Sequence, residues 1–306
     1  MSIELQNRLY WEGSLFGILC KHLFVHPKPV PSNVSLSGRT AIVTGSNSGI
    51  GFEASRQLLQ LGVGHLVMGV RSQARGDAAA AELRAQFPCA RVDVSILDMA
   101  DYDSVVAFVR RCREDLEHID HAILNAGQQN ECFRRSEKTG HEMVLQVNYL
   151  STSLLAFLLV ALMREKRRPQ AGSPPVLSIV GSDTMWLSSM SVTSPVFPRL
   201  DDPKAFAGFR QYSGSKLLIM MFVYQLKRNF SPDEILINVC NPGLVGDTGL
   251  GASGQPRSVV TRFFAWLFHT LFARTAEAGA SNYIYAQAVV GPRSHGSFVS
   301  DWDIKP

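Results

Sequence analysis

Short apolar segments alternate with helix-like stretches along most of the chain. Six segments have the length and composition of strands: Thr40–Thr44, His65–Val70, Arg91–Ser95, Asp120–Leu124, Pro175–Ser182 and Leu236–Cys240. Between them lie helical stretches at residues 50–61, 74–86, 102–112, 142–164 and 212–228. Strands that alternate with helices predict βαβ units and a parallel sheet, and apolar strands without alternation are typical of a sheet covered on both faces. The pattern therefore predicts an α/β fold with a doubly wound parallel sheet in a single domain.

The N-terminal part does not follow this alternation. Residues 26–37 contain three prolines and three serines, which is typical of a linker, so we expect an appendage and linker at 1–37 and the main domain at 38–306. Residues 9–25 are apolar but interrupted by Glu12 and Lys21. They lack the flanks of a signal peptide, and no run reaches the ~18 uninterrupted apolar residues of a spanning helix. Two interpretations stay open: a helix packed on the body, or attachment to a membrane surface.

Composition narrows the class of protein. The chain has 306 residues, of which 46% are hydrophobic, and a net charge of +4 without a dense Lys/Arg tract. This excludes a disordered chain and indicates no nucleic-acid partner. The five cysteines are scattered without a Cys-x-x-Cys pair, and no His-Glu-x-x-His motif is present. We therefore expect no metal site and a reducing, intracellular compartment.

A glycine-rich loop lies between the first strand and the first helix. Glycines let a pyrophosphate approach the backbone, and the N–H groups at a helix N-terminus attract phosphate. The position between a strand and a helix is the context that a dinucleotide site requires. The candidate cofactor-binding residues of this loop are Gly45, Ser46, Asn47, Ser48, Gly49, Ile50 and Gly51.

Arg71 follows the second strand, where an NAD site usually has an acidic residue that binds the ribose 2′-hydroxyl. A guanidinium cannot accept that hydrogen bond, but it can pair with a 2′-phosphate. The residue therefore favours NADP(H) over NAD(H). The alternative is a solvated arginine at a strand end, with Asp77 in the next helix as another acid to consider.

Tyr212 and Lys216 are four residues apart at the start of a predicted helix, so both lie on one face. A free tyrosine has a pKa near ~10, and a nearby ammonium group is expected to lower it. Ser182 ends the fifth predicted strand, from which a hydroxyl could reach a bound carbonyl. Together the three residues predict a site for proton transfer.

In combination, these motifs resemble the short-chain dehydrogenase/reductase family. The loop at 44–51, Asn125-Ala126-Gly127, Asn148, Ser182, Tyr212-x-x-x-Lys216 and Pro242-Gly243 occur in the family's order over about residues 38–291. Within the family the chain is similar to the retinol-dehydrogenase-like and protochlorophyllide-reductase-like branch. The supporting segments are Val70-Arg71, Leu97-Asp98-Met99, Val147–Leu150 and Glu277–Ala280. The lead-in LFVHPKPVP also looks like fungal members, many of which act in secondary metabolism. The resemblance implies a Rossmann fold.

The resemblance also implies roles for individual residues. Tyr212 would be the general acid or base, Lys216 would lower its pKa and bind the nicotinamide ribose, and Ser182 would bind the substrate carbonyl. Asn148 would hold a water that relays protons to Lys216. The remaining cofactor contacts would come from Asp98, Met99, Asn125, Pro242, Gly243, Val245 and Thr248. Thr248 lies one position later than the family's threonine, and Asp247 takes that place.

The expected function is an NADP(H)-dependent oxidoreductase that acts on a carbonyl or alcohol of a lipophilic small molecule, in the reducing direction. Aromatic residues in 183–211 and the apolar segment Phe263–Ala273 suggest walls of the substrate pocket. The apolar helix at 146–163 suggests either core or a homo-oligomer interface. A catalytically silent NADP-sensing or scaffold protein with the same fold is the alternative function.

Overall fold

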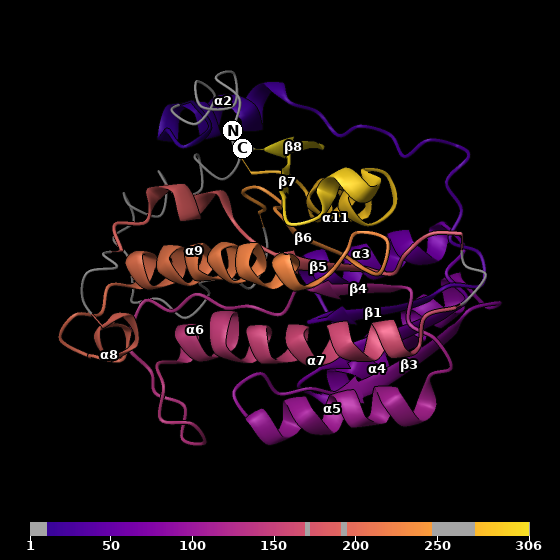
Figure 1. Ribbon diagram of the computed structural model, residues 1–306, viewed down its shortest axis with the longest axis horizontal. Coiled ribbons are helices and arrows are strands. Elements are labelled where there is room, and N and C mark those ends of the chain that lie inside the picture. The colour runs from indigo at the N-terminus through magenta and orange to yellow at the C-terminus, as the bar shows by residue number, and fades with distance from the viewer. Residues whose placement is uncertain (1–10, 169–171, 191–194, 247–272, 306) are drawn as a thin grey trace.

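The computed structural model describes residues 11–168, 172–190, 195–246 and 273–305 (Figure 1). Within them, eight strands form one sheet in the order β3-β2-β1-β4-β5-β6-β7-β8. All neighbours are parallel except β7 and β8. The strands are β1 Thr40–Thr44, β2 His65–Val70, β3 Arg91–Ile96, β4 His121–Leu124, β5 Val176–Val180, β6 Leu236–Cys240, β7 Phe298–Ser300 and β8 Asp303–Lys305. This confirms the predicted doubly wound α/β fold.

Helices cover both faces of the sheet. Those of the described residues are α2 Leu15–Phe24, α3 Gly49–Gln60, α4 Gln73–Gln86, α5 Tyr102–Asp115, α6 Met143–Leu145, α7 Thr152–Glu165, α8 Val196–Leu200, α9 Gly208–Leu226 and α11 Ala276–Ala288. Figure 1 shows α5, α7 and α9 side by side across one face. One apolar core lies beneath these three helices, and a second packs the opposite face against α3, α4 and α11.

Several bounds differ from the sequence-based expectation. The predicted helix at 142–164 contains a π-helical turn at Gln146–Ser151, and α9 begins at Gly208 rather than at 212. Strands β7 and β8 and helix α11 were not predicted. The two strands have three residues each, which is too short for a strand pattern to show in the sequence.

The combined helix Met143–Glu165 is long and apolar enough to cross a membrane by length and composition. Its second half, α7, buries Leu155, Leu159 and Val160 completely in the core beside α5. In this structure α7 is therefore a core helix that packs against the sheet.

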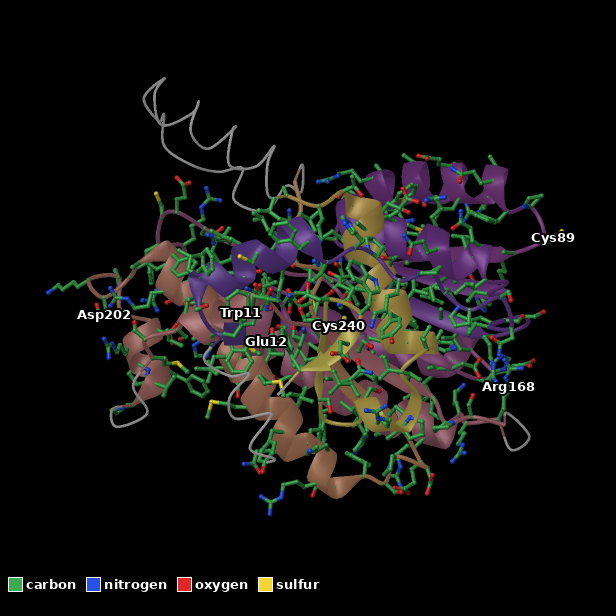
Figure 2. The ribbon with its side chains drawn as sticks, turned by 90° about the horizontal axis from the view of Figure 1, so that it is seen from above. Trp11, Glu12, Cys89, Arg168, Asp202 and Cys240 are labelled. Carbon is green, nitrogen blue, oxygen red and sulfur yellow. The ribbon has the colours of Figure 1, made fainter. Side chains whose placement is uncertain are left out.

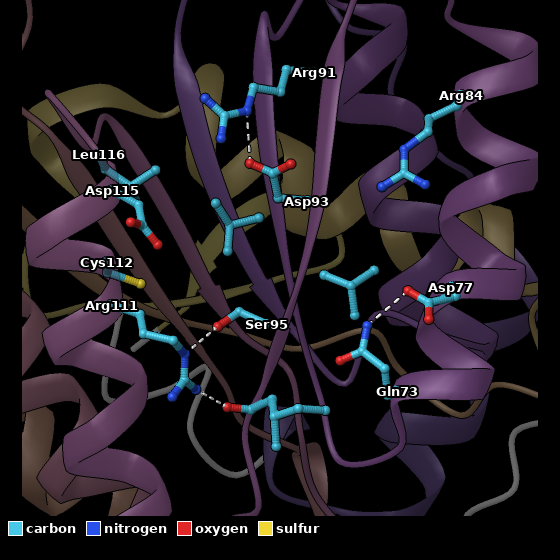
Figure 3. Close-up of a pocket in the computed structure, with 13 residues that line it drawn as sticks. Gln73, Asp77, Arg84, Arg91, Asp93, Ser95, Arg111, Cys112, Asp115 and Leu116 are labelled. Carbon is cyan, nitrogen blue, oxygen red and sulfur yellow. Dashed lines mark hydrogen bonds and ion pairs between the residues drawn. The ribbon is translucent and has the colours of Figure 1, made fainter.

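A groove of about 710 Å³ runs along the outer edge of β3, between α4 and α5 (Figure 3). Arginines from both helices donate to the carbonyl groups of this edge strand: Arg84 to Val92 at 2.5 Å, and Arg111 to Ile96. An exposed strand edge otherwise invites pairing with another chain. The arginine side chains in this groove therefore satisfy backbone carbonyl groups of β3 and shield this edge strand from pairing with another chain. Strand β8 forms the opposite edge of the sheet.

The carboxyl ends of β1 and β4 lie at the point where the strand order reverses. In open α/β sheets, ligands bind outside the carboxyl ends of the strands at this point. The pairing of β1 with β4 is therefore the part of the fold that positions a site.

Asp120 fixes this pair at its other end. Its carboxylate accepts hydrogen bonds from the Thr40 backbone at 2.8 Å, from Arg39 at 2.9 Å and from Arg168 at 2.9 Å. Burial raises the pKa of Asp120, but the hydrogen bonds from Arg168, Thr40 and Arg39 outweigh it, so the pKa lies below its usual value. The ionised carboxylate therefore stabilises the folded state.

We predict that Asp120→Asn lowers the free energy of unfolding at pH 7 by about 2–3 kcal/mol, because a buried hydrogen-bonded charge pair is broken. Since the pKa is depressed in the folded state, this stabilisation is present above the unfolded pKa and is lost as the pH falls below about 4. Urea denaturation at several pH values measures both effects. The control Glu114→Gln removes an exposed carboxylate, 62% accessible, and should change stability by less than about 0.5 kcal/mol. A constant difference between Asp120→Asn and the parent protein at all pH values would contradict the assignment.

Candidate active site

The loop after β1 is shaped by glycines and by one asparagine. Gly45 and Gly49 have φ angles of 65° and 58°, which favour glycine. The side-chain amide of Asn125, at the end of β4, donates to the Thr44 carbonyl at 3.0 Å and to the Gly45 carbonyl at 3.3 Å. The Asn125 side chain therefore ties the loop to the neighbouring strand.

The loop forms a cradle at the N-terminus of α3. A Cβ at Gly51 would lie 2.5 Å from the Asn125 amide nitrogen and would also strike the Gly45 carbonyl, so only glycine fits there. Ser46 is fully buried, and its hydroxyl has no hydrogen-bond partner among the described residues. Asn47 and Ile50 are half-buried, and Ser48 precedes the helix without capping it through its side chain. The backbone approach, the helix N-terminus and the unsatisfied hydroxyl fit the pyrophosphate of a dinucleotide.

The residues expected at the adenosine end lie at the same edge of the sheet. Arg71 is exposed directly after β2, whose Gly69 carbonyl accepts from the Gly45 backbone at 2.8 Å. Asp98 is half-buried after β3 and accepts from the Ala100 backbone at 2.9 Å, beside the buried Met99. Asp77 lies within α4, away from the strand end.

Three side chains expected to carry the chemistry meet at the carboxyl end of β5. Lys216 donates to the Val180 carbonyl at 2.8 Å, and its ammonium lies 5.6 Å from the centre of the Tyr212 ring. Ser182 lies close enough to the Tyr212 hydroxyl to lower its pKa as a hydrogen-bonding neighbour. Ser182 also accepts from the Thr184 hydroxyl at 3.0 Å. The structure therefore brings Ser182, Tyr212 and Lys216 together.

Burial dominates the electrostatics of this group. Burial raises the pKa of Tyr212, and the hydrogen bond with Ser182 only reduces that rise. Burial also lowers the pKa of Lys216 to about 8, despite the opposing effect of Cys240. We expected Lys216 to lower the pKa of Tyr212 below its usual value, and this expectation is wrong for the structure described. Lys216 is not among the groups that shift the pKa of Tyr212, so removal of the phenol from water sets the direction of the shift.

Asn148 lies in the π-helical turn Gln146–Ser151. Its side chain accepts from the Gln128 backbone at 2.8 Å, donates to the Gln128 carbonyl at 2.9 Å and donates to the Ser215 hydroxyl at 3.1 Å. A Cβ at Gly127 would lie 3.3 Å from the Asn148 oxygen and 3.7 Å from the Lys216 nitrogen. Asn148 therefore joins the loop after β4 to helix α9, next to Lys216.

The segment after β6 closes the site on another side. Gly243 has a φ angle of 78°, and Pro242 and the buried Val245 pack against Gly279 of α11. The backbone of Leu244 donates to His22 of helix α2 at 3.2 Å. Thr248, Asp247 and almost all of the predicted wall Phe263–Ala273 lie outside the described residues. Of the other predicted wall, Asp183–Leu187 forms a 3₁₀ helix and Val196–Leu200 forms α8.

Sequence reasoning missed two residues at this site. Tyr283 of α11 is fully buried and donates to the Asn125 oxygen at 3.3 Å. Asp183 directly follows Ser182 in the chain and is buried. Tyr283 lies 158 positions from Asn125, and no local motif marks that pair. A charged residue next to Ser182 was visible in the sequence and could have marked Asp183.

Comparisons with known proteins agree with this geometry. The sequence pattern of the family described as short chain dehydrogenase matches residues 39–173. Short chain dehydrogenase virL of Hypocrea virens is 46% identical over 306 residues, which cover all of this chain and 88% of the relative. The chain belongs to the short chain dehydrogenase family and is an oxidoreductase.

Solved structures share the fold at lower identity. The NADPH-bound short chain oxidoreductase of Pseudomonas aeruginosa PAO1 is 20% identical with a TM-score of 0.64, and the match covers 87% of this chain and 96% of that one. The 3-oxoacyl-[acyl-carrier protein] reductase of Brucella melitensis, in complex with NAD, is 20% identical with a TM-score of 0.65 and the same two coverages. These two structures contain different cofactors, so the shared fold does not decide between them.

We predict that Gly51→Ala weakens NADPH binding by at least about tenfold, since the new methyl group displaces the Gly45 carbonyl or the Asn125 amide from the cradle. Titration of NADPH fluorescence measures the affinity, and thermal unfolding checks that the fold is intact. The matched control is Gly214→Ala, a helical glycine in α9 whose added Cβ would meet its nearest atom at 3.8 Å. Equal affinities for the two variants would show that the loop does not hold the cofactor as described.

Proposed function

We propose that the protein is an NADP(H)-dependent reductase of a ketone or aldehyde, able to run in reverse as an alcohol dehydrogenase. The observation that carries this proposal is the meeting of Ser182, Tyr212 and Lys216 at the end of β5, next to the glycine loop. A hydroxyl, a phenol and an ammonium group at one place can bind a carbonyl oxygen and give it a proton.

Each of the three side chains has a separate role. Tyr212 donates its proton to the carbonyl oxygen, and the raised pKa keeps it protonated at neutral pH, as donation requires. Ser182 donates a hydrogen bond to the same oxygen and stabilises its developing charge. Lys216 provides positive charge behind the phenol and binds the nicotinamide ribose. When bound, the nicotinamide supplies the hydride.

In this proposal Asn148 helps to supply the protons that return Tyr212 to its protonated form. It lies beside Lys216, and its amide already bonds Gln128 and Ser215. A water held at this position would connect Lys216 with solvent, so that Tyr212 can be reprotonated after each turnover.

Cofactor preference rests on Arg71. Its exposed side chain follows β2, beside the strand that carries the glycine loop, where it can pair with a 2′-phosphate. NADP(H) is therefore the preferred cofactor, with reduction as the favoured direction. Asp98, Met99, Asn125, Pro242, Gly243 and Val245 would line the rest of the cofactor cleft.

The substrate is a lipophilic small molecule. In the described part of the segment after Ser182, the half-buried Trp186 and the exposed Phe197 are the candidates for the pocket wall, whereas Met185 is buried in the core. The relatives are fungal short chain dehydrogenases, and a role in secondary metabolism follows from the resemblance of the lead-in sequence to such enzymes.

Two exposed apolar surfaces suggest partners for an intracellular protein. Phe157 of α7 and Met221 and Tyr224 of α9 are 60%, 45% and 53% exposed on one face, which suits a second copy of the chain. On α2, Phe16 and Phe24 are 70% and 75% exposed, which suits peripheral contact with a membrane.

We predict that Tyr212→Phe lowers kcat at least about a thousandfold and leaves NADPH affinity within about twofold, because only the transferable proton is lost. The assay follows NADPH oxidation with decanal and phenanthrenequinone as apolar probes. The control Tyr224→Phe removes a hydroxyl from the exposed side of the same helix and should keep full activity. Binding of NADPH without turnover by the parent protein would instead favour the catalytically silent alternative.

We also predict that Arg71→Asp weakens NADPH binding by at least about a hundredfold and affects NADH much less, because a favourable charge pair with the 2′-phosphate becomes a repulsion. Parallel fluorescence titrations with the two cofactors measure the selectivity. Arg110→Asp makes the same charge change on α5, where the arginine is 69% exposed, and should leave selectivity unchanged. If Arg71→Asp binds the two cofactors in the parent ratio, Arg71 points to solvent.

A further inference from the structure

A cluster of buried charges joins helix α2 to the C-terminal hairpin of β7 and β8. Lys21 of α2 pairs with Glu12 at 2.6 Å and lies 3.7 Å from Asp301. Lys305 of β8 pairs with Glu12 at 3.1 Å, and Arg274 pairs with Asp301 at 2.8 Å. In the view of Figure 2, Glu12 accordingly lies next to the hairpin, drawn in yellow. All five side chains are at least nine-tenths buried, so these ion pairs fix the place of α2 on the body of the protein.

The next residue of α2, His22, contacts the loop Pro242–Gly246, which follows β6 and is called the β6 loop below. The Leu244 backbone donates a hydrogen bond to Nε2 of His22 at 3.2 Å. The imidazole nitrogen that accepts this bond carries no proton. A Cβ at Gly243 would lie 2.7 Å from the His22 ring and 2.9 Å from the Arg274 guanidinium group. His22 therefore contacts the loop backbone through one directed hydrogen bond and through close packing.

Other hydrogen bonds hold the two ends of the β6 loop. At its start, the side-chain oxygen of Asn241 accepts from the Gly243 backbone at 3.2 Å. Toward its end, the Arg274 backbone donates to the Leu244 carbonyl at 2.8 Å, and the Gly246 backbone donates to the Arg274 carbonyl at 3.1 Å. The N–H of Leu244, in the middle of the loop, is the group that His22 accepts from. The ends are thus fixed by the main domain, and the middle is fixed by helix α2.

The order of the strands indicates which end of a bound cofactor the β6 loop would meet. The glycine loop follows β1, Arg71 follows β2, and Ser182 follows β5. A dinucleotide with its pyrophosphate over the glycine loop and its adenosine toward β2 would extend its nicotinamide toward β5. Strand β6 is the next strand, and its Cys240 carbonyl accepts from the backbone of Gly181, directly before Ser182, at 2.8 Å. The β6 loop therefore begins beside the nicotinamide end of the site.

We propose that His22 is a positioning residue for the nicotinamide end of the cofactor and acts through the Leu244 backbone on the β6 loop. Helix α2 is then part of the cofactor-binding unit rather than an appendage to the main domain. This inference rests on the proposed NADP(H)-dependent function, because that function places a nicotinamide beside the β6 loop. It extends that function by giving a residue of the N-terminal helix a part in cofactor binding.

The physical reason lies in the cost of ordering a loop. When binding itself must order part of the chain, that cost reduces the affinity for the ligand. Glycine leaves the backbone freer than other residues, and the β6 loop contains Gly243, with a φ angle of 78°, and Gly246. Contacts from outside the loop must therefore hold it in place before the cofactor binds. The ion pairs of Lys21 hold α2, and the adjacent His22 connects α2 to the loop.

The test measures NADPH affinity by fluorescence titration for the parent protein, His22→Leu and His22→Gln. His22→Leu removes the acceptor for the Leu244 N–H but keeps a side chain of similar size, so NADPH binding should weaken at least about fivefold. His22→Gln places an amide oxygen near the position of Nε2, so its affinity should stay within about twofold of the parent value. The matched control His26→Leu makes the same change at an exposed histidine after α2 and should leave the affinity unchanged.

A second ligand separates a role at the nicotinamide end from a general loss of structure. 2′-Phospho-ADP-ribose contains the adenosine, pyrophosphate and ribose parts of NADPH without the nicotinamide ring, and calorimetric titration measures its affinity. His22→Leu should bind it within about twofold of the parent protein, because the glycine loop and Arg71 lie at the other end of the site. An equal loss of affinity for both ligands would overturn the proposal. So would an equal loss of NADPH affinity in His22→Leu and His22→Gln.

Turnover distinguishes the failure of this inference from the failure of the proposed function. Decanal and phenanthrenequinone serve as substrates, with NADPH as the reductant. A parent protein that turns over neither probe, while His22→Leu shows the expected loss of NADPH affinity, would contradict the reductase function and support the role of His22. Turnover by the parent protein together with unchanged NADPH affinity in His22→Leu would contradict the role of His22 and leave the reductase function intact.

Discussion

The site depends first on the side-chain amide of Asn125. This group crosses from the end of β4 to the carbonyls of Thr44 and Gly45 at the end of β1, at the point where the strand order reverses. The same amide sets the space that Gly51 must leave, and its oxygen accepts from Tyr283. Without that bridge two parallel strands would end side by side with unsatisfied carbonyls. With it, the loop becomes a fixed cradle above the sheet.

The second constraint comes from removing charges from water. Burying an ion is unfavourable unless partners surround it. Lys21 satisfies this through Glu12 and Asp301, so helix α2 is held against the body by these ion pairs together with the buried side chain of Ile18. The side chains of Phe16 and Phe24 remain exposed. The helix thus differs from an ordinary amphipathic helix, because it buries a lysine beside Ile18 while other large apolar side chains stay exposed.

Local sequence patterns correctly predicted the strands and motifs that neighbouring residues determine. The bounds of β1, β2 and β6 are as expected because runs such as Thr40–Thr44 are β-branched and apolar. The glycine loop and the Tyr212–Lys216 pair could also be predicted, because each lies within a few residues of sequence. Contacts between distant residues were not predictable in this way: Glu12 and Lys305 are 293 positions apart. Glu12 and Lys21 consequently looked like interruptions of an apolar segment. The pKa of Tyr212 was also mispredicted, because spacing indicates a neighbouring charge but not the depth of burial.

That depth of burial sets the protonation states of the site. Burial shifts the pKa values of Tyr212 and Lys216 in opposite directions, each toward the neutral form. Tyr212 is then a protonated phenol at neutral pH, while Lys216, with a pKa of about 8, still carries its charge on most molecules. A protonated phenol is the state that can give a proton to a carbonyl oxygen, and the charged amine donates to the Val180 carbonyl beside it. Oxidation would start from the phenolate, so the raised pKa of Tyr212 predicts that the oxidising direction needs a higher pH than the reducing one, while the equilibrium between them is set by the substrate and the cofactor.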